Sequence, residues 1–293
     1  MIFKGTSIFR LTGRGPDATG ALDDYSGAIL VTTDCGCSNP RSVVIIPDGL
    51  IFQSAKGIYL LTRAMEAKYI GADVEAFSGN LVTGGALIPT TNQIRLTLAD
   101  SSEGPLAVEY DYYAGQWSSL TNVSAVDATL WNDTFLYLRS SGVVLQETAG
   151  VFSDNGSYVR MRLMTSWLQF AQLAGFQRIY ELEITGQFKS AHRLRIRAAY
   201  DFNPALIQEA YIDPEGGTAY GEGPFGDGVY GGDFPTYIWR FYPEWQKCTA
   251  IRFVIEDVQS GTTTGESLNL SGLSLEIGIK KGLQPRPATA STG

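Results

Sequence analysis

Short runs of apolar residues, separated by polar turns, fill the first half of the chain. Residues Ile2 to Leu11, Gly49 to Leu61 and Phe135 to Gln146 each hold an apolar strand, a short turn and a second apolar strand. A longer copy of the same pattern spans Gln93 to Trp117. The pattern predicts a series of antiparallel β-hairpins.

The turns of these hairpins recur along the chain. Ser7, Gly57, Gly104 and Gly142 stand at intervals of roughly 40–50 residues, which is the period of β-propeller blades. The copies are degenerate, so unrelated hairpins within one sandwich are the alternative. Four hairpins would close a ring of only about four blades. Because the chain begins inside a hairpin pattern, we expect an incomplete propeller over residues 1–160, which an upstream segment or another chain completes.

Longer strands with basic–apolar alternation follow in the second half. Arg193, Arg195 and Arg197 alternate with apolar residues, so we expect the three arginines on one face of a sheet. We predict a connector over 161–175, a β-sandwich over 176–283 and a flexible tail over 284–293. The predicted fold class is all-β, with propeller-like repeated hairpins followed by a β-sandwich.

The charge balance argues against a protein that grips nucleic acid. The chain has 22 basic and 30 acidic side chains and a formal net charge of -8. Nucleic-acid binding needs clustered Lys and Arg, because counterion release drives it, and the sequence has no such cluster. DNA near this protein is therefore expected to pass without being held. No apolar run approaches the ~18 residues of a membrane span, so we expect no membrane partner.

The histidine and the cysteines offer little chemistry. His192 is the one histidine of the chain, and no Gly-x-Ser-x-Gly motif accompanies it for a catalytic triad. Cys35 and Cys37 are too close together for the usual zinc pair. Cys248 precedes an apolar strand and is expected to pack as a small hydrophobic residue. We predict no metal site, no cofactor and no catalytic residue.

Paired carboxylates deserve separate consideration, because glycan hydrolases use them. Nothing in the sequence places two of them across a cleft, and acidic residues at i and i+2 of an exposed strand are ordinary solubilising residues. We therefore predict that the protein is not an enzyme. The carboxylates considered are Asp23, Asp24, Glu109, Asp111, Asp201, Glu256 and Asp257.

A long segment rich in Gly, Tyr and Phe spans residues 213–235. It contains no Lys or Arg, which excludes a phosphate-binding loop. A loop of this length is usually functional or disordered. Two interpretations stay open, a surface loop without a role and a subunit contact. In the second, the contact residues would be Tyr220, Phe225, Tyr230 and Phe234.

Three blocks of the sequence resemble one known family. The first, Val31 to Phe77, contains a Ser-x-x-Gly hairpin turn at Ser54 and a Tyr-Ile-Gly turn at Tyr69. The others span Gly175 to Pro204 and Gln246 to Val258. As a combination, they resemble the tail nozzle (tail hub, or packaged-DNA stabilisation) proteins of short-tailed phages. Family members are usually longer at the N-terminus.

The resemblance implies a structural virion protein, assembled in the bacterial host cytoplasm. It implies a ring of identical subunits, a hexamer, below the portal and adaptor proteins. Tail fibres or spikes would be further partners. The ring would conduct and retain genomic DNA, which an acidic lumen would repel without binding.

Two functions of other classes are alternatives. One is a receptor- or carbohydrate-binding module, since sandwiches and propellers often bind sugars. The other, ranked below it, is a glycan depolymerase.

Overall fold

The chain is nearly all β. The computed structural model describes residues 1–15, 19, 24–101, 104–121, 123–171, 176–189, 192–213, 236–259 and 265–280. The helices in these ranges are short 3-10 helices, η1 (Pro40–Ser42), η2 (Ala72–Phe77) and η3 (Pro89–Thr91). No helix in the described part is long and apolar enough to span a membrane. The chain forms two compact units, Met1–Ala149 and Gly150–Gly293.

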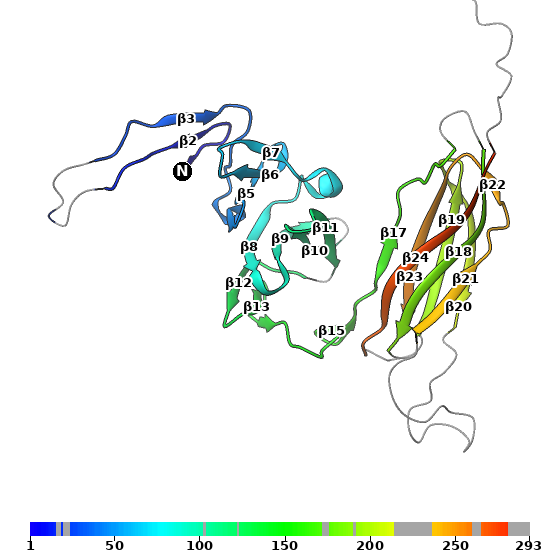
Figure 1. Ribbon diagram of the computed structural model, residues 1–293. Coiled ribbons are helices and arrows are strands. Elements are labelled where there is room, and N and C mark those ends of the chain that lie inside the picture. The colour runs from blue at the N-terminus through cyan, green and yellow to red at the C-terminus, as the bar shows by residue number, and fades with distance from the viewer. Residues whose placement is uncertain are drawn as a thin grey trace, which may run out of the picture. The chain divides into compact units, whose positions relative to one another are not determined.

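The first unit consists of antiparallel sheets that follow one another along the chain (Figure 1). Each of the four predicted hairpins lies in a different sheet, which confirms the propeller-like repeat. The strands, sheet by sheet, are β1 (Ile2–Phe3), β2 (Ile8–Arg10) and β3 (Ile29–Thr32); β4 (Val44–Ile46), β5 (Gly49–Ser54), β6 (Gly57–Thr62) and β7 (Ala67–Tyr69); β8 (Val82–Ile88), β9 (Gln93–Ser101), β10 (Gly104–Asp111) and β11 (Gln116–Thr121); β12 (Asp127–Trp131), β13 (Thr134–Leu138) and β14 (Val144–Gln146).

Consecutive sheets pack face to face. Successive side chains of a strand point to opposite faces, so one inner strand contacts the sheets on both of its sides. In β5, Phe52 packs toward the first sheet, and its neighbour Ile51 packs toward the third. In β10, Val108 packs toward the second sheet, and Ala107 packs toward the fourth. The inner sheets therefore bury both faces, as propeller blades do.

The first and last sheets each leave one face exposed. On the first sheet, Ile2 and Leu30 are 42% and 51% exposed, and both lie beside Phe9 in the register. On the last sheet, Trp131 is 72% exposed and Val144 is 58% exposed. Each of these two faces thus carries apolar side chains that no described residue of this unit buries.

The second predicted hairpin shows why its turn requires glycine. Gly57 has a φ of +114°, in the left-handed region. A Cβ at this position would lie 2.8 Å from the Tyr69 ring of strand β7. Tyr69 in turn packs against Tyr59, so the Ser54–Gly57 turn and the Tyr69–Gly71 turn lie together.

The second unit contains a β-sandwich (Figure 1). One sheet has the order β17-β23-β19-β20; in the other, β18 pairs with β21, β22 and β24. A short β15–β16 hairpin precedes them. The strands are β15 (Ser153–Asp154), β16 (Ser157–Tyr158), β17 (Arg162–Met164), β18 (Phe176–Phe188), β19 (His192–Tyr200), β20 (Asn203–Ile212), β21 (Thr236–Phe241), β22 (Lys247–Cys248), β23 (Ile251–Gln259) and β24 (Leu268–Lys280).

The core of the sandwich lies between its two sheets. Ile184 of one sheet and Ile196 and Phe253 of the other are almost completely buried in a single hydrophobic cluster. Cys248 belongs to this cluster, which confirms its expected packing role. Residues 162–164, which we expected within a connector, instead form β17 and pair with β23 at the edge of the sandwich.

Candidate functional site

The four aromatic residues predicted as a subunit contact, Tyr220, Phe225, Tyr230 and Phe234, lie outside the described residues. The chain enters that segment from β20 and leaves it into β21, which belong to different sheets of the sandwich. The contact role of this loop stays a prediction.

The cysteine motif has a packing role. Cys35 and Cys37 are buried in the hydrophobic cluster between the first two sheets. A Cβ on Gly36 would lie 2.1 Å from the Lys4 carbonyl oxygen, so only glycine allows this approach to the first hairpin. No group of three or more metal-ligating side chains occurs in the part of the chain that the structure describes.

Several of the candidate carboxylates hold the fold together. Asp201 lies in the turn between β19 and β20 with a φ of +53°, and its Oδ1 accepts hydrogen bonds from the Thr249 backbone N–H and hydroxyl at 2.6 and 2.7 Å. Asp111 accepts from the backbone N–H groups of Tyr113 and Ala114, both at 2.8 Å. These are turn-stabilising contacts.

Two further carboxylates also have structural partners. Glu109 forms an ion pair with Arg95 at 2.6 Å, and both side chains are nearly buried. Asp257 is fully buried at the end of the sandwich core. Burial and a hydrogen bond to Asp257 raise the pKa of the Tyr158 hydroxyl. Of the other three, Asp24 is exposed, Glu256 is buried, and Asp23 lies outside the described residues. Among the candidates that the structure describes, no two come together as an acid and a base.

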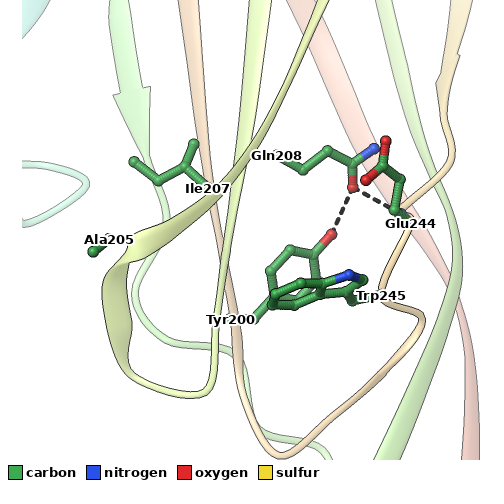
Figure 2. A pocket seen from close by; sticks show the side chains of 6 residues that line it. All are labelled: Tyr200, Ala205, Ile207, Gln208, Glu244 and Trp245. Atoms are coloured by element: carbon green, nitrogen blue, oxygen red, sulfur yellow. Dashed lines mark hydrogen bonds between the residues drawn. The ribbon is translucent and has the colours of Figure 1, made fainter.

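A pocket of about 190 Å³ opens on the second unit (Figure 2). No motif in the sequence pointed to this pocket, because its residues come from separate strands and a loop. The Gln208 Oε1 accepts hydrogen bonds from the Tyr200 hydroxyl and from the Glu244 backbone N–H, each at 2.7 Å. The Gln208 amide also donates to the Tyr242 carbonyl oxygen at 3.1 Å. The lining residues are Tyr200, Ala205, Ile207, Gln208, Glu244 and Trp245.

The pocket combines an aromatic wall with polar groups. The Tyr200 and Trp245 rings lie 5.5 Å apart, and Trp245 is half exposed. Burial raises the pKa of Tyr200 to about 12, so its hydroxyl stays a hydrogen-bond donor at neutral pH. Gln208 already uses its amide within the protein. The Glu244 carboxylate and the Trp245 ring therefore remain the groups with which a ligand would interact.

The three predicted arginines do share one face, the outer face of the sheet β17-β23-β19-β20. Residues paired across adjacent strands point to the same side, and the register sets Arg195 opposite Glu256 and Tyr211. We call this the basic face. Its charged residues are Arg162, Arg193, Arg195, Arg197, Arg252, Glu209, Glu256 and Asp213.

Glu256 stands at the centre of the basic face. Its carboxylate is 3% exposed and lies 2.8 Å from Arg197, 3.2 Å from Arg162 and 3.7 Å from Arg195. Hydrogen bonds from Tyr211 and Arg195 lower the pKa of the neighbouring Glu209. Among the described residues of this face, five arginines share three carboxylates. The basic face therefore has an excess of positive charge, although the whole chain is acidic.

Comparisons with known proteins assign no family. No protein-family model matches the sequence, and no curated protein matches it significantly. Among solved structures, the chain is similar to an exo-β-1,3-galactanase from Phanerochaete chrysosporium, crystallised with β-1,3-galactotriose. The two share 8% sequence identity over 92% of this chain and 75% of that chain, with a TM-score of 0.29. A similarity this low assigns no function.

Proposed function

We propose that this protein is a structural subunit of the tail nozzle of a short-tailed phage. Identical copies, six in number, form a ring below the portal and adaptor proteins, and the genome leaves through the ring. The proposal rests on the resemblance of the three sequence blocks. The structural observation that supports it is the exposure of large apolar side chains on the outer sheet at each end of the propeller-like unit, namely Ile2 and Leu30 on the first sheet and Trp131 and Val144 on the last. Exposed apolar faces of this kind mark protein contacts.

The charge of the chain suits the conduction of DNA. With a net charge of -8, a ring of several copies repels phosphates, so the genome passes without adhering to the wall. Most arginines of the basic face already pair with carboxylates of the same face. The face is a sheet surface and not a groove that would hold a DNA strand.

A structural role also fits the chemistry of the described residues. Glu109, Asp111, Asp201 and Glu256 are each engaged by arginines, hydroxyls or backbone N–H groups that stabilise the fold. A catalytic acid and base would instead face a common cleft. We therefore propose no catalytic activity and no cofactor.

The proposal predicts binding to the partly built virion. Purified protein, mixed with tail-less particles or with adaptor–portal complexes, should add density below the adaptor in electron micrographs. The same experiment without adaptor provides the control. Particles that look identical with and without the protein would contradict the nozzle assignment.

The second candidate function is carbohydrate or receptor binding, and the pocket beside Trp245 is the observation that favours it. Exposed aromatic rings beside polar groups are suited to stack on sugars. A glycan depolymerase has no comparable support, since no carboxylate pair lines that pocket.

Glycan binding separates the two candidates. The nozzle proposal predicts that wild type and a Trp245→Ala variant both fail to bind a glycan array. Binding by the wild type that falls about tenfold in Trp245→Ala, roughly the loss of one stacking contact, would favour the second candidate. Trp131→Ala is the matched control, because Trp131 is an exposed tryptophan of the other unit.

A further inference from the structure

The two outer faces of the sandwich differ in charge. The basic face has an excess of positive charge. In the middle of the outer face of the opposite sheet, three glutamates, Glu181, Glu183 and Glu276, lie around Arg240. These residues, with Ser274 and Leu275, line one shallow depression. We call the three glutamates and Arg240 the acidic patch.

The acidic patch has unbalanced negative charge. The register places Glu181 of β18 directly opposite Glu276 of β24, and like charges in this position repel. Arg240 lies 3.1 Å from Glu181 and 3.5 Å from Glu183. Glu276 has no ion pair with any residue that the structure describes. The patch would therefore gain from a further cation.

Two basic residues limit the extent of the patch. Arg178 and Lys247 are paired with each other in the register at the β22 end of the same sheet. The negative charge is thus confined to the middle of the sheet, beside the exposed Ile238. The basic face likewise has exposed apolar residues among its charges, namely Met164, Ile207 and Tyr211. Each face therefore combines charges with apolar contact area, as protein interfaces do.

We propose that the basic face of one copy docks on the acidic patch of the next copy. This inference rests on the proposed ring and identifies the surfaces that would join its subunits. A contact between two basic faces, or between two acidic patches, would bring like charges together. Opposite faces of one subunit make a head-to-tail contact, and such contacts close into a ring when the rotation between copies allows it.

Charge reversal on each face tests the pairing. The basic-face variant is Arg193→Glu with Arg252→Glu. Arg193 is 46% exposed and pairs with the exposed Asp213, and Arg252 lies over the Trp167 ring, so both changes leave the arginines around Glu256 in place. The acidic-patch variant is Glu183→Lys with Glu276→Lys. Each variant alone should lose assembly, because both contacting surfaces then carry the same sign. An equimolar mixture should recover assembly. When the two variants alternate, each reversed basic face meets a reversed acidic patch, and each unchanged basic face meets an unchanged acidic patch.

The controls reverse the same number of exposed charges elsewhere. Asp73→Lys with Glu75→Lys, and Arg63→Glu with Lys68→Glu, change residues of the first unit. Sedimentation velocity gives the size of each species, and circular dichroism verifies that each variant is folded. The controls should assemble as the wild type does. Raising the salt concentration should weaken wild-type assembly, since exposed charges are screened.

The outcomes distinguish this inference from the proposed function. If the wild type forms rings and both charge-reversed variants form them equally well, the pairing of the two faces is overturned and the ring proposal stands. Folded variants that stay apart after mixing also overturn the pairing. Reversals that spare the rings but abolish adaptor binding assign the faces to a different protein, which again overturns it. A wild type that stays monomeric overturns the proposed function and the pairing together.

Discussion

Replacing Glu256 with Gln is expected to lower the free energy of unfolding of the second unit by about 3 kcal/mol. The Glu256 carboxylate is almost completely buried beneath Arg162, Arg195 and Arg197. Its removal leaves clustered guanidinium groups without their shared counter-charge, and breaking a buried ion pair typically costs about 3–5 kcal/mol. We expect the lower end, because Arg195 and Arg197 keep 28% and 23% of their surface in water.

The matched control for this variant is Glu209→Gln on the same face. Glu209 is 33% exposed and pairs with Arg195 at 2.6 Å, and exposed pairs contribute about 0–1 kcal/mol. Chemical denaturation followed by near-ultraviolet circular dichroism measures both variants. Equal losses in the two would show that Glu256 does not hold the basic face together. An unchanged free energy of unfolding in Glu256→Gln would contradict the structural role of this carboxylate.

Replacing Phe52 with Ala is expected to destabilise the first unit by about 3–5 kcal/mol, the usual cost of removing a buried phenylalanine ring. Phe52 is fully buried between the first and second sheets. Its ring lies 5.2 Å from Phe3 and 6.0 Å from Tyr59. Because the sheets pack in series, the loss should be greatest at the first sheet and smallest at the last.

Hydrogen exchange tests this distribution along the chain. Amide protection should fall in β1 to β3 and change little in β12 to β14. The control is Tyr113→Ala, since Tyr113 is 88% exposed and makes little packing contact. Uniform loss of protection across the unit would contradict packing in series and would indicate one cooperative core.

The sequence predicted those parts of the fold that depend on local pattern. Period-2 alternation located the hairpins and set Arg193, Arg195 and Arg197 on one face of their sheet. It could not show which strands pair, because pairing joins distant segments. Examples are the pairing of β17 with β23 and the position of Glu181 opposite Glu276 on neighbouring strands. Only the strand register shows that the residues of the acidic patch lie together on one face of their sheet.

The pocket was beyond sequence reasoning for the same reason. Tyr200, Gln208 and Trp245 stand in no recognisable spacing, and the hairpin turn at Asp201 brings the first two together. The sequence identified the candidate carboxylates but not their roles. Asp201 and Glu256 are conspicuous in the sequence, yet their partners, Thr249 and the arginines, are what identify them as structural.

The most direct test of the central claim is negative-stain electron microscopy of the purified protein. The account predicts ring-shaped particles with sixfold symmetry in two-dimensional class averages, present at low salt and lost in the charge-reversed variants. Particles the size of one chain, at all protein and salt concentrations tested, would contradict it.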